Sequence, residues 1–300
     1  TRSYWPMVIL GYVLDIIAVP ALALVGEHGW IAACLLLVVQ RMGKAIKKPA
    51  KDTIMSFAAS QEGAGRSFGL QELLDQIGAF LGPVLLWLVM LGRTDASPIR
   101  TYSLCFAVLA IPGGITLLLL LYTRSRFPNP EQFEPEPKEY IPFCMKKSFI
   151  LYIAGISLFA FGFIDYSLIA MHISRTAAAL AGAAGPITGE TLPPLYAGAM
   201  LIDAVSALFF GFLYDRIGVR SLIFSTLLSS GFAVFIFSMH SVPALLVGIA
   251  LWGIGMGAQE SILKAAVSSM VPKSSRATGY GIFECSFGFF WFLGSWLMGA

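Results

Sequence analysis

Seven carboxylates interrupt segments of the chain that are otherwise almost entirely apolar. An ionised group near the middle of a bilayer costs about 2.5–3.5 kcal/mol, so such side chains are expected to face a cavity or a partner. Burial raises the pKa of a carboxyl group toward the range in which it binds and releases a proton near neutral pH. The pattern therefore indicates proton exchange inside a membrane. The seven residues are Asp15, Glu72, Asp75, Asp165, Asp203, Glu260 and Glu284.

The depth of each carboxylate within its segment separates these candidates. Asp203 and Asp15 lie closest to the middle of their apolar segments, and we favour them for proton coupling or substrate contact. Asp75 lies about one helical turn from Glu72 and beside Gln76, so these residues form a polar helical face. Glu72 is also near the basic end of its segment, from which its side chain could reach the lipid headgroups.

The other carboxylates occupy less central positions. Glu260 and Lys264 are four residues apart on one helical face, and we expect them to form an ion pair. That pair is as consistent with a structural role as with transport. Asp165 is expected in the outer part of its helix and Glu284 in the inner part of another.

The composition requires a membrane environment. Hydrophobic residues form 57% of the 300 residues and charged residues only 12%, with a mean hydropathy of +0.78. A globular domain carries roughly 25% charged residues. A hydrocarbon core about 30 Å thick needs about 20 helical residues, and continuous apolar runs favour helices over the alternating strands of a barrel. The runs predict nine transmembrane helices, at 4–25, 30–48, 67–91, 99–122, 148–172, 192–213, 219–239, 243–264 and 277–300.

Basic residues gather on one side of this predicted topology. With residue 1 in the cytoplasm, sixteen lysines and arginines fall at cytoplasmic loops and span ends, among them Arg41, Lys44, Arg66 and Arg276. Only three, Arg93, Arg100 and Arg175, fall on the opposite side. This bias follows the positive-inside rule. The net charge of +3 therefore reports topology and does not indicate a nucleic-acid partner.

A polar segment at 124–147 divides the chain into two halves. It alternates five prolines with four glutamates and is expected to be an extended cytoplasmic linker. It separates an N-terminal half bundle at 1–123 from a C-terminal half bundle at 148–300. The two halves echo each other, because Arg66-x-x-Gly69 followed by Gly78 recurs 210 residues later as Arg276-x-x-Gly279 followed by Gly288. Internal repeats are typical of secondary transporters.

A short charged turn separates the apolar segments at 192–213 and 219–239. Its glycines permit a sharp bend and close helix approach. Asp215 is expected near the start of the following helix, where a carboxylate favours the positive end of the helix dipole. Pairing with a residue such as Arg276 would latch one conformational state. The turn contains Gly211, Leu213, Asp215, Arg216, Gly218 and Arg220.

These six residues resemble the cytoplasmic signature of the major facilitator superfamily, from which Val219 departs. The resemblance implies that the turn lies between helices eight and nine of a twelve-helix pattern. The first half would then supply helices three to six and the second half helices seven to eleven. We therefore expect a fragment of a polytopic, all-α bundle with two pseudo-symmetric halves.

A second resemblance concerns the helix predicted at 67–91. Gly69, Gly78, Gly82 and Pro83 keep the Gly-x8-Gly-x3-Gly-Pro spacing of antiporters in this superfamily, although its closing glycines are missing. Gly78 and Gly82 are expected to form a close-packing face, and Pro83 to bend the helix.

The basic block that begins at Arg41 and Lys44 is similar to the fourth-helix exit of drug-efflux members. The resemblances together imply a secondary active transporter that works by alternating access, with proton-coupled efflux of small amphipathic or drug-like molecules as the favoured activity. A proton-coupled importer of sugars or organic acids is the alternative with the same fold. A membrane scaffold or sensor that does not transport is the alternative of another class.

The sequence lacks the common nucleotide-binding, hydrolase and metal-binding motifs. We therefore expect a protein that is not an enzyme and uses no cofactor or metal. The expected partners are the lipid bilayer, a small-molecule substrate and protons. We expect a monomer, located in a bacterial inner membrane.

Overall fold

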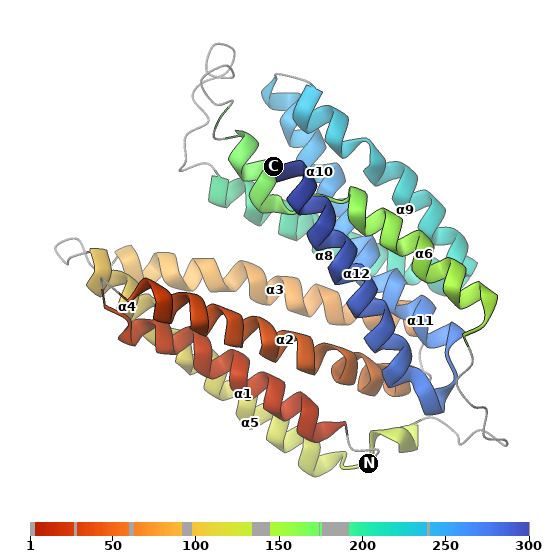
Figure 1. The fold of residues 1–300 in the computed structure, drawn as a ribbon, viewed down its shortest axis with the longest axis horizontal. Helices are drawn as coiled ribbons and strands as arrows, with labels where there is room; N and C mark the ends of the chain where they lie inside the picture. The colour runs from red at the N-terminus through yellow and green to blue at the C-terminus, as the bar shows by residue number, and fades with distance from the viewer. Residues whose placement is uncertain are drawn as a thin grey trace. The chain divides into compact units, whose positions relative to one another are not determined.

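The computed structural model describes residues 4–26, 29–59, 63–91, 98–133, 145–173, 175, 192–238 and 241–299. Regular structure in these ranges is helical throughout, with no strand (Figure 1). The all-α class predicted from the continuous apolar runs is confirmed. In lipid this class satisfies every backbone group within its own segment.

Contacts within the chain define two compact units. Unit 1 comprises residues 1–58 and 81–136, and unit 2 comprises residues 59–80 and 137–300. The helix α3 (Ala64–Leu91) therefore contributes its first part to unit 2 and its last part to unit 1. The sequence places all of this helix in the first half, and that division into half bundles stays a prediction.

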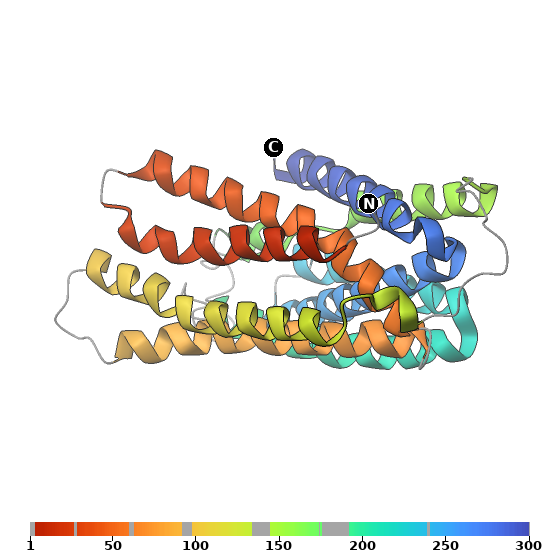
Figure 2. The same ribbon diagram turned by 90° about the horizontal axis from the view of Figure 1, so that it is seen from below.

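Unit 1 is built around the antiparallel pair α1 and α2. Gly11 and Gly43 allow the close approach, because a Cβ atom on Gly43 would lie 2.7 Å from the Gly11 carbonyl oxygen. Figures 1 and 2 show α1 in red beside α5 in yellow, and these two helices are in contact. The elements of unit 1 besides the end of α3 are α1 (Trp5–Ala21), η1 (Leu22–Leu24), α2 (Trp30–Ala59), α4 (Pro98–Val108), α5 (Ala110–Arg126) and η2 (Pro130–Phe133).

Unit 2 is organised by two helix pairs, α8 with α10 and α6 with α12 (Figure 1). Unit 2 also contains two short π-helices, η5 and η6. The elements are α6 (Lys147–Gly162), a helical segment at 166–173, α8 (Leu192–Ile217), η4 (Gly218–Arg220), α9 (Ser221–Ser230), η5 (Val234–Ser238), α10 (Val242–Ala258), η6 (Gln259–Leu263), α11 (Lys264–Met270), η7 (Lys273–Ser275) and α12 (Arg276–Gly299).

An aromatic cluster forms the core of unit 2. Phe163 packs against Phe232, Trp252 and Trp291, with ring centroids 5.2–6.1 Å apart. The Trp252 indole N–H donates a hydrogen bond to the carbonyl oxygen of Ile164 at 2.9 Å. Because α6 ends at Gly162, this carbonyl lies in a break between helices and needs a partner. The cluster therefore fixes the bend of this membrane segment.

Six of the described segments are long and apolar enough to cross a membrane, judged by length and composition. One of them, Leu195–Ser238, is 44 residues long and covers two predicted spans with the turn between them. The helices α2 and α3 are outside this set, and both carry several charged residues. Crossings at 30–48 and 67–91 therefore stay predictions, although both ranges are helical.

The helix α2 extends beyond the predicted second span. Residue 48 is not a helix end, because α2 continues through Pro49 to Ala59. Its last turns are held by burial of Ala50 and Phe57, and the Thr53 hydroxyl donates to the Pro49 carbonyl oxygen at 2.7 Å. The linker prediction at 124–147 is tested only in part. There α5 extends to Arg126 and η2 follows, while 134–144 lie outside the described residues.

Candidate functional site

A network of buried polar side chains joins three segments of unit 2. From α3, the Gln76 side-chain amide donates to Glu72 Oε1 at 2.8 Å and to Asp203 Oδ2 of α8 at 3.0 Å. The Lys264 ammonium lies 2.7 Å from Glu260 Oε2 and 3.6 Å from Glu72 Oε2. The predicted Glu260–Lys264 ion pair is confirmed. We call these five residues the acidic network.

The acidic network is deeply buried, and its five residues include three carboxyl groups and one ammonium group. Asp203 is 0% exposed, Lys264 4% and Glu72 5%, while Glu260 is partly buried. The Lys264 ammonium lies beside two of these carboxylates, and the third, that of Asp203, is linked to Glu72 through Gln76. Asp203 Oδ1 also has no hydrogen-bond partner in the described part of the chain. Removing such charges from water is costly unless they are compensated, so the network favours uptake of a cation.

A π-helical turn places Glu260 and Lys264 in this network. The helix α10 changes to the π-helix η6 at Gln259, and α11 resumes at Lys264. Such turns are rare and often occur at functional sites. Two buried hydroxyls hold its end, because Tyr152 donates to the Leu263 carbonyl oxygen at 2.8 Å and Tyr280 to that of Lys264 at 3.0 Å.

Small residues bring the helices of the network together. A Cβ atom on Gly257 would collide with the backbone of Asp203, so α10 and α8 touch at the level of the acidic network. Along α3, Gly65 meets the backbone of Gly211, and a Cβ atom on Gly69 would lie 2.7 Å from the Ala207 carbonyl oxygen. Small residues spaced by four thus face each other on α3 and α8, which is a close-packing arrangement of membrane helices.

The predicted position of Asp215 is wrong. It lies in the last turn of α8, because that helix continues to Ile217. Its carboxylate accepts hydrogen bonds from the backbone N–H groups of Gly65 at 2.8 Å and Arg66 at 2.7 Å. These donors belong to the first turn of α3, whose N–H groups have no partners within the helix. Asp215 therefore caps a different helix from the one predicted.

The other residues of the charged turn surround this cap. Gly218 adopts a φ of +64°, which a residue with a side chain rarely adopts, and it begins the short helix η4. Leu213 is partly buried on α8, whereas Arg216 and Arg220 are exposed at the same end. The Arg66 guanidinium lies over the Phe212 ring at 5.5 Å. Residues at the end of α8 thus hold the start of α3 through contacts between side chains and backbone, while the chain itself continues into η4 and α9.

Replacing Asp215 should weaken this junction in two steps. Asp215→Ala removes both acceptors and is expected to lower the free energy of unfolding by about 1–2 kcal/mol, as for loss of a helix cap. Asp215→Asn keeps one acceptor and should lose about half as much. Thermal unfolding in detergent, followed by tryptophan fluorescence, measures both changes. Equal stability of the alanine variant and the unsubstituted protein would contradict the cap.

In unit 1 the structure gives Asp15 a clear partner. Its carboxylate pairs with the Lys47 ammonium, which also lies 3.9 Å from the centroid of the Tyr12 ring. Lys47 reaches Asp15 because α1 and α2 approach closely at Gly11 and Gly43, one helical turn before each of these residues. Arg41 and Lys44 are exposed on the same helix. Asp15 is therefore compensated by an ion pair, and Asp203 remains the stronger candidate for coupling.

Three of the predicted carboxylates are not among the five residues of the acidic network. Asp165 is exposed and accepts hydrogen bonds from the Ser167 backbone and hydroxyl at 2.9 Å, so it caps the helical segment at 166–173. Asp75 is exposed on α3, and Glu284 is partly buried on α12. This capping role accounts for an acidic residue at position 165 without requiring a role in transport.

The close-packing face predicted at Gly78 and Gly82 of α3 stays a prediction. A Cβ atom on Gly78 or Gly82 would meet nothing within 4 Å among the described residues, whereas Gly69 is packed against α8. Pro83 lies within α3, and its side chain lies outside the described residues. The basic residues of the repeat occupy matching places, because Arg66 lies in the first turn of α3 and Arg276 begins α12.

Sequence reasoning underestimated Glu72 and overlooked two tyrosines. Glu72 is buried and bonded to Gln76, so it does not reach toward the headgroups. No sequence pattern indicates Tyr152 or Tyr280, because each donates its hydroxyl to a backbone carbonyl oxygen that is remote in the chain, in η6 or in α11. For Glu72, the polar face that it shares with Gln76 was the available signal.

A buried ionisable network within long apolar helices defines a polytopic membrane protein. The sequence profile described as Major Facilitator Superfamily matches residues 170–300. Uncharacterized proteins of Mycobacterium tuberculosis and Mycobacterium bovis are each 35% identical over 294 residues, which cover 96% of this chain and 68% of the relative. An uncharacterized MFS-type transporter of Methanocaldococcus jannaschii is 28% identical over 289 residues, covering 92% of this chain and 66% of the relative.

The chain belongs to the major facilitator superfamily. It is therefore a secondary transporter in the general sense, an integral multi-pass membrane protein whose surroundings are a lipid bilayer and whose substrate is a small molecule. Its assignment to helices three to eleven of twelve stays a prediction.

Proposed function

We propose that the protein couples proton movement to the efflux of small amphipathic molecules, and that the acidic network is the coupling site. The observation that carries this proposal is one buried ammonium, that of Lys264, beside the carboxylates of Glu260 and Glu72, with a third carboxyl group, that of Asp203, linked to Glu72 through Gln76. Such a site gains stability from an added positive charge. A proton and a cationic substrate are the two charges that would compete for it.

Protonation supplies the switch in this mechanism. Lys264 lies between Glu260 and Glu72, and Gln76 links Glu72 to Asp203. A proton on one carboxyl group removes the attraction that holds Lys264 on that side, so the ammonium moves toward the other carboxylate. Because these groups belong to α3, α8 and the η6–α11 segment, the change in pairing alters contacts between helices. Alternating access requires a two-state element of this kind.

The charged turn at 211–220 acts as the gate in this proposal. Asp215 holds the start of α3 through two hydrogen bonds at one end of the α3–α8 contact, and Gln76 bonds Asp203 further along the same pair. A change at Asp203 is therefore transmitted along two helices that touch through Gly65 and Gly69. Release of the Asp215 cap would accompany opening of this end.

The negative excess of the network indicates the class of substrate. A site with more carboxyl groups than ammonium groups attracts cations and repels anions. We therefore infer export of amphipathic cations rather than import of organic acids. The mycobacterial relatives support a location in a bacterial plasma membrane.

Asp203→Asn tests this function. In liposomes with an imposed pH gradient, the protein should move ethidium, an amphipathic cation, and the internal dye pyranine should report proton movement in the opposite direction. We expect Asp203→Asn to lower ethidium-driven proton flux at least tenfold, because its side chain cannot exchange a proton. Asp165→Asn is the matched control, since Asp165 is exposed and caps a helix, and it should keep at least half of the flux.

Two outcomes would contradict the proposal. Flux in Asp203→Asn equal to that of the unsubstituted protein would remove Asp203 from coupling. Ethidium movement that ignores the direction of the pH gradient would remove proton coupling itself. Tryptophan fluorescence of each variant establishes that the loss of flux is not a loss of fold.

A further inference from the structure

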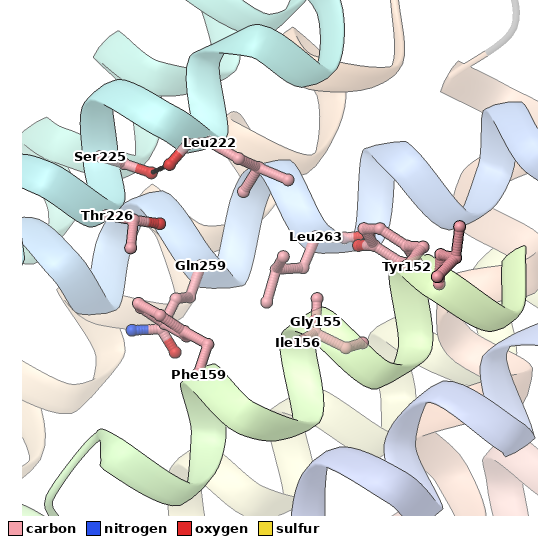
Figure 3. A pocket seen from close by; sticks show the side chains of 10 residues that line it. Tyr152, Gly155, Ile156, Phe159, Leu222, Ser225, Thr226, Gln259 and Leu263 are labelled. Carbon is pink, nitrogen blue, oxygen red and sulfur yellow. Dashed lines mark hydrogen bonds between the residues drawn. The ribbon is translucent and has the colours of Figure 1, made fainter. Parts of the chain in front are cut away.

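A cavity of about 240 Å³ lies in unit 2 between α6, α9 and the π-helix η6 (Figure 3). None of the five residues of the acidic network lines it. Its walls are largely apolar, with Gly155, Ile156 and Phe159 from α6, and Leu222 from α9. Ligand sites are typically concave and apolar with a few placed polar groups, and this cavity has that character at a small size.

The buried side-chain amide of Gln259 lies at the wall of this cavity. Gln259 is 5% exposed, and neither its Oε1 nor its Nε2 has a hydrogen-bond partner in the described part of the chain. Figure 3 shows its side chain extending from η6 beside Phe159. A buried amide without partners is costly, so a buried donor and acceptor at a cavity wall indicate a ligand with matching groups.

Two other polar groups of the lining are already engaged. The Tyr152 hydroxyl donates to the Leu263 carbonyl oxygen at 2.8 Å, and the Ser225 hydroxyl donates to that of Leu222 at 3.1 Å. No charged residue is among those that line the cavity. The ligand is therefore neutral, because a charge would be buried without compensation.

We propose that this cavity binds a small aromatic carboxamide. A carboxamide presents one N–H donor beside one carbonyl acceptor, which matches the unpaired amide of Gln259 in a two-bond arrangement. The attached ring fills the apolar part of the cavity and contacts the Phe159 ring. This site goes beyond the transport proposed above, because binding to it requires neither a proton gradient nor Asp203.

The cavity also adjoins the π-helix η6, which carries Glu260 of the acidic network. Gln259 is the first residue of η6, and Leu263 at its end lines the same cavity. A ligand held by Gln259 therefore contacts the element that places Glu260 and Lys264. The binding test below does not depend on any effect transmitted in this way.

The probe is 4-fluorobenzamide, observed by fluorine NMR with the full chain in lipid nanodiscs. Saturable binding above that of empty nanodiscs is expected. Gln259→Leu, which removes the hydrogen-bonding groups, and Gly155→Leu, which fills the cavity, should each weaken binding at least tenfold. A side chain at position 155 is tolerated, because a Cβ atom there meets nothing within 4 Å. Gly162→Leu is the matched control on α6, equally open at its Cβ position, and should stay within twofold.

A second probe tests the hydrogen bonds. N,N-dimethyl-4-fluorobenzamide has no N–H donor and should bind at least tenfold more weakly. Equal binding of the two probes, or binding unchanged by both Gln259→Leu and Gly155→Leu, would overturn the proposal. Signal equal to that of empty nanodiscs would show partitioning into lipid only and would overturn it as well. Transport failing while binding persists would contradict the proposed function and leave this site intact.

Discussion

Lys264→Met is expected to lose both transport and stability. Lys264 is the one basic residue in contact with Glu72 and Glu260 in the described acidic network, at 3.6 Å and 2.7 Å. Breaking a buried ion pair by removing one partner leaves an uncompensated charge and costs about 3–5 kcal/mol. We expect a loss of about 3 kcal/mol in the free energy of unfolding, and ethidium-driven proton flux at least a hundredfold lower. Detergent unfolding and the liposome assay measure the two effects.

A rescue experiment separates charge from packing. Adding Glu260→Gln to Lys264→Met removes one uncompensated carboxylate and should recover at least 1 kcal/mol, since neutral replacement of both members of a buried pair is often tolerated. Lys273→Met is the control, because Lys273 lies in η7, outside the acidic network, and its loss should change stability little. Lys264→Met as stable as the unsubstituted protein would mean that the network does not require its ammonium group.

Gly65→Leu should be among the most destabilising single changes in α3. A Cβ atom at this position would overlap the Gly211 carbonyl oxygen and lie 2.9 Å from Asp215 Oδ1. A backbone carbonyl cannot move aside as the end of a flexible side chain can, so the helices must separate. Overpacking costs about 1–3 kcal/mol, and we expect the upper end of that range because the Asp215 cap is lost as well. Chemical unfolding in detergent measures the change.

Gly78→Leu is the matched control for this prediction. Gly78 lies on the same helix, but a Cβ atom there meets nothing within 4 Å of the described residues. Its replacement should leave stability within about 0.5 kcal/mol, because Leu has the higher helix propensity and meets no obstacle. Comparable losses in the two variants would contradict the α3–α8 contact through Gly65 and Gly211. A larger loss in Gly78→Leu would restore the face expected from sequence.

The acidic network could be predicted in part. Local spacing was sufficient for the Glu260–Lys264 pair, because residues four apart meet on any helix, and the π-turn in between did not separate them. Burial of Asp203 followed from its depth in an apolar run. The contact of Glu72 with Lys264 joins residues 192 positions apart on different helices, and no local pattern encodes such a distance.

The contacts of the charged turn and of the small residues on α3 could not be read from local spacing. The sequence places Asp215 near the start of the following helix and favours Gly78 and Gly82 as a close-packing face. The structure instead pairs Asp215 with the start of α3 and buries Gly65 and Gly69 against α8. Which glycine of a helix touches another helix depends on the side on which that neighbouring helix lies.

By itself the sequence determined the membrane environment and the helical class, and its short motifs carried the family resemblance. The first two properties follow from the solvent that each segment tolerates and from the length of its apolar run, and both are local. Only the tertiary structure decided that Glu72 and Glu260 share Lys264, that Asp215 caps α3, and that Gln259 faces a cavity with an unpaired amide. Those properties depend on which helices touch and at what level, and that is fixed by packing between segments remote in sequence.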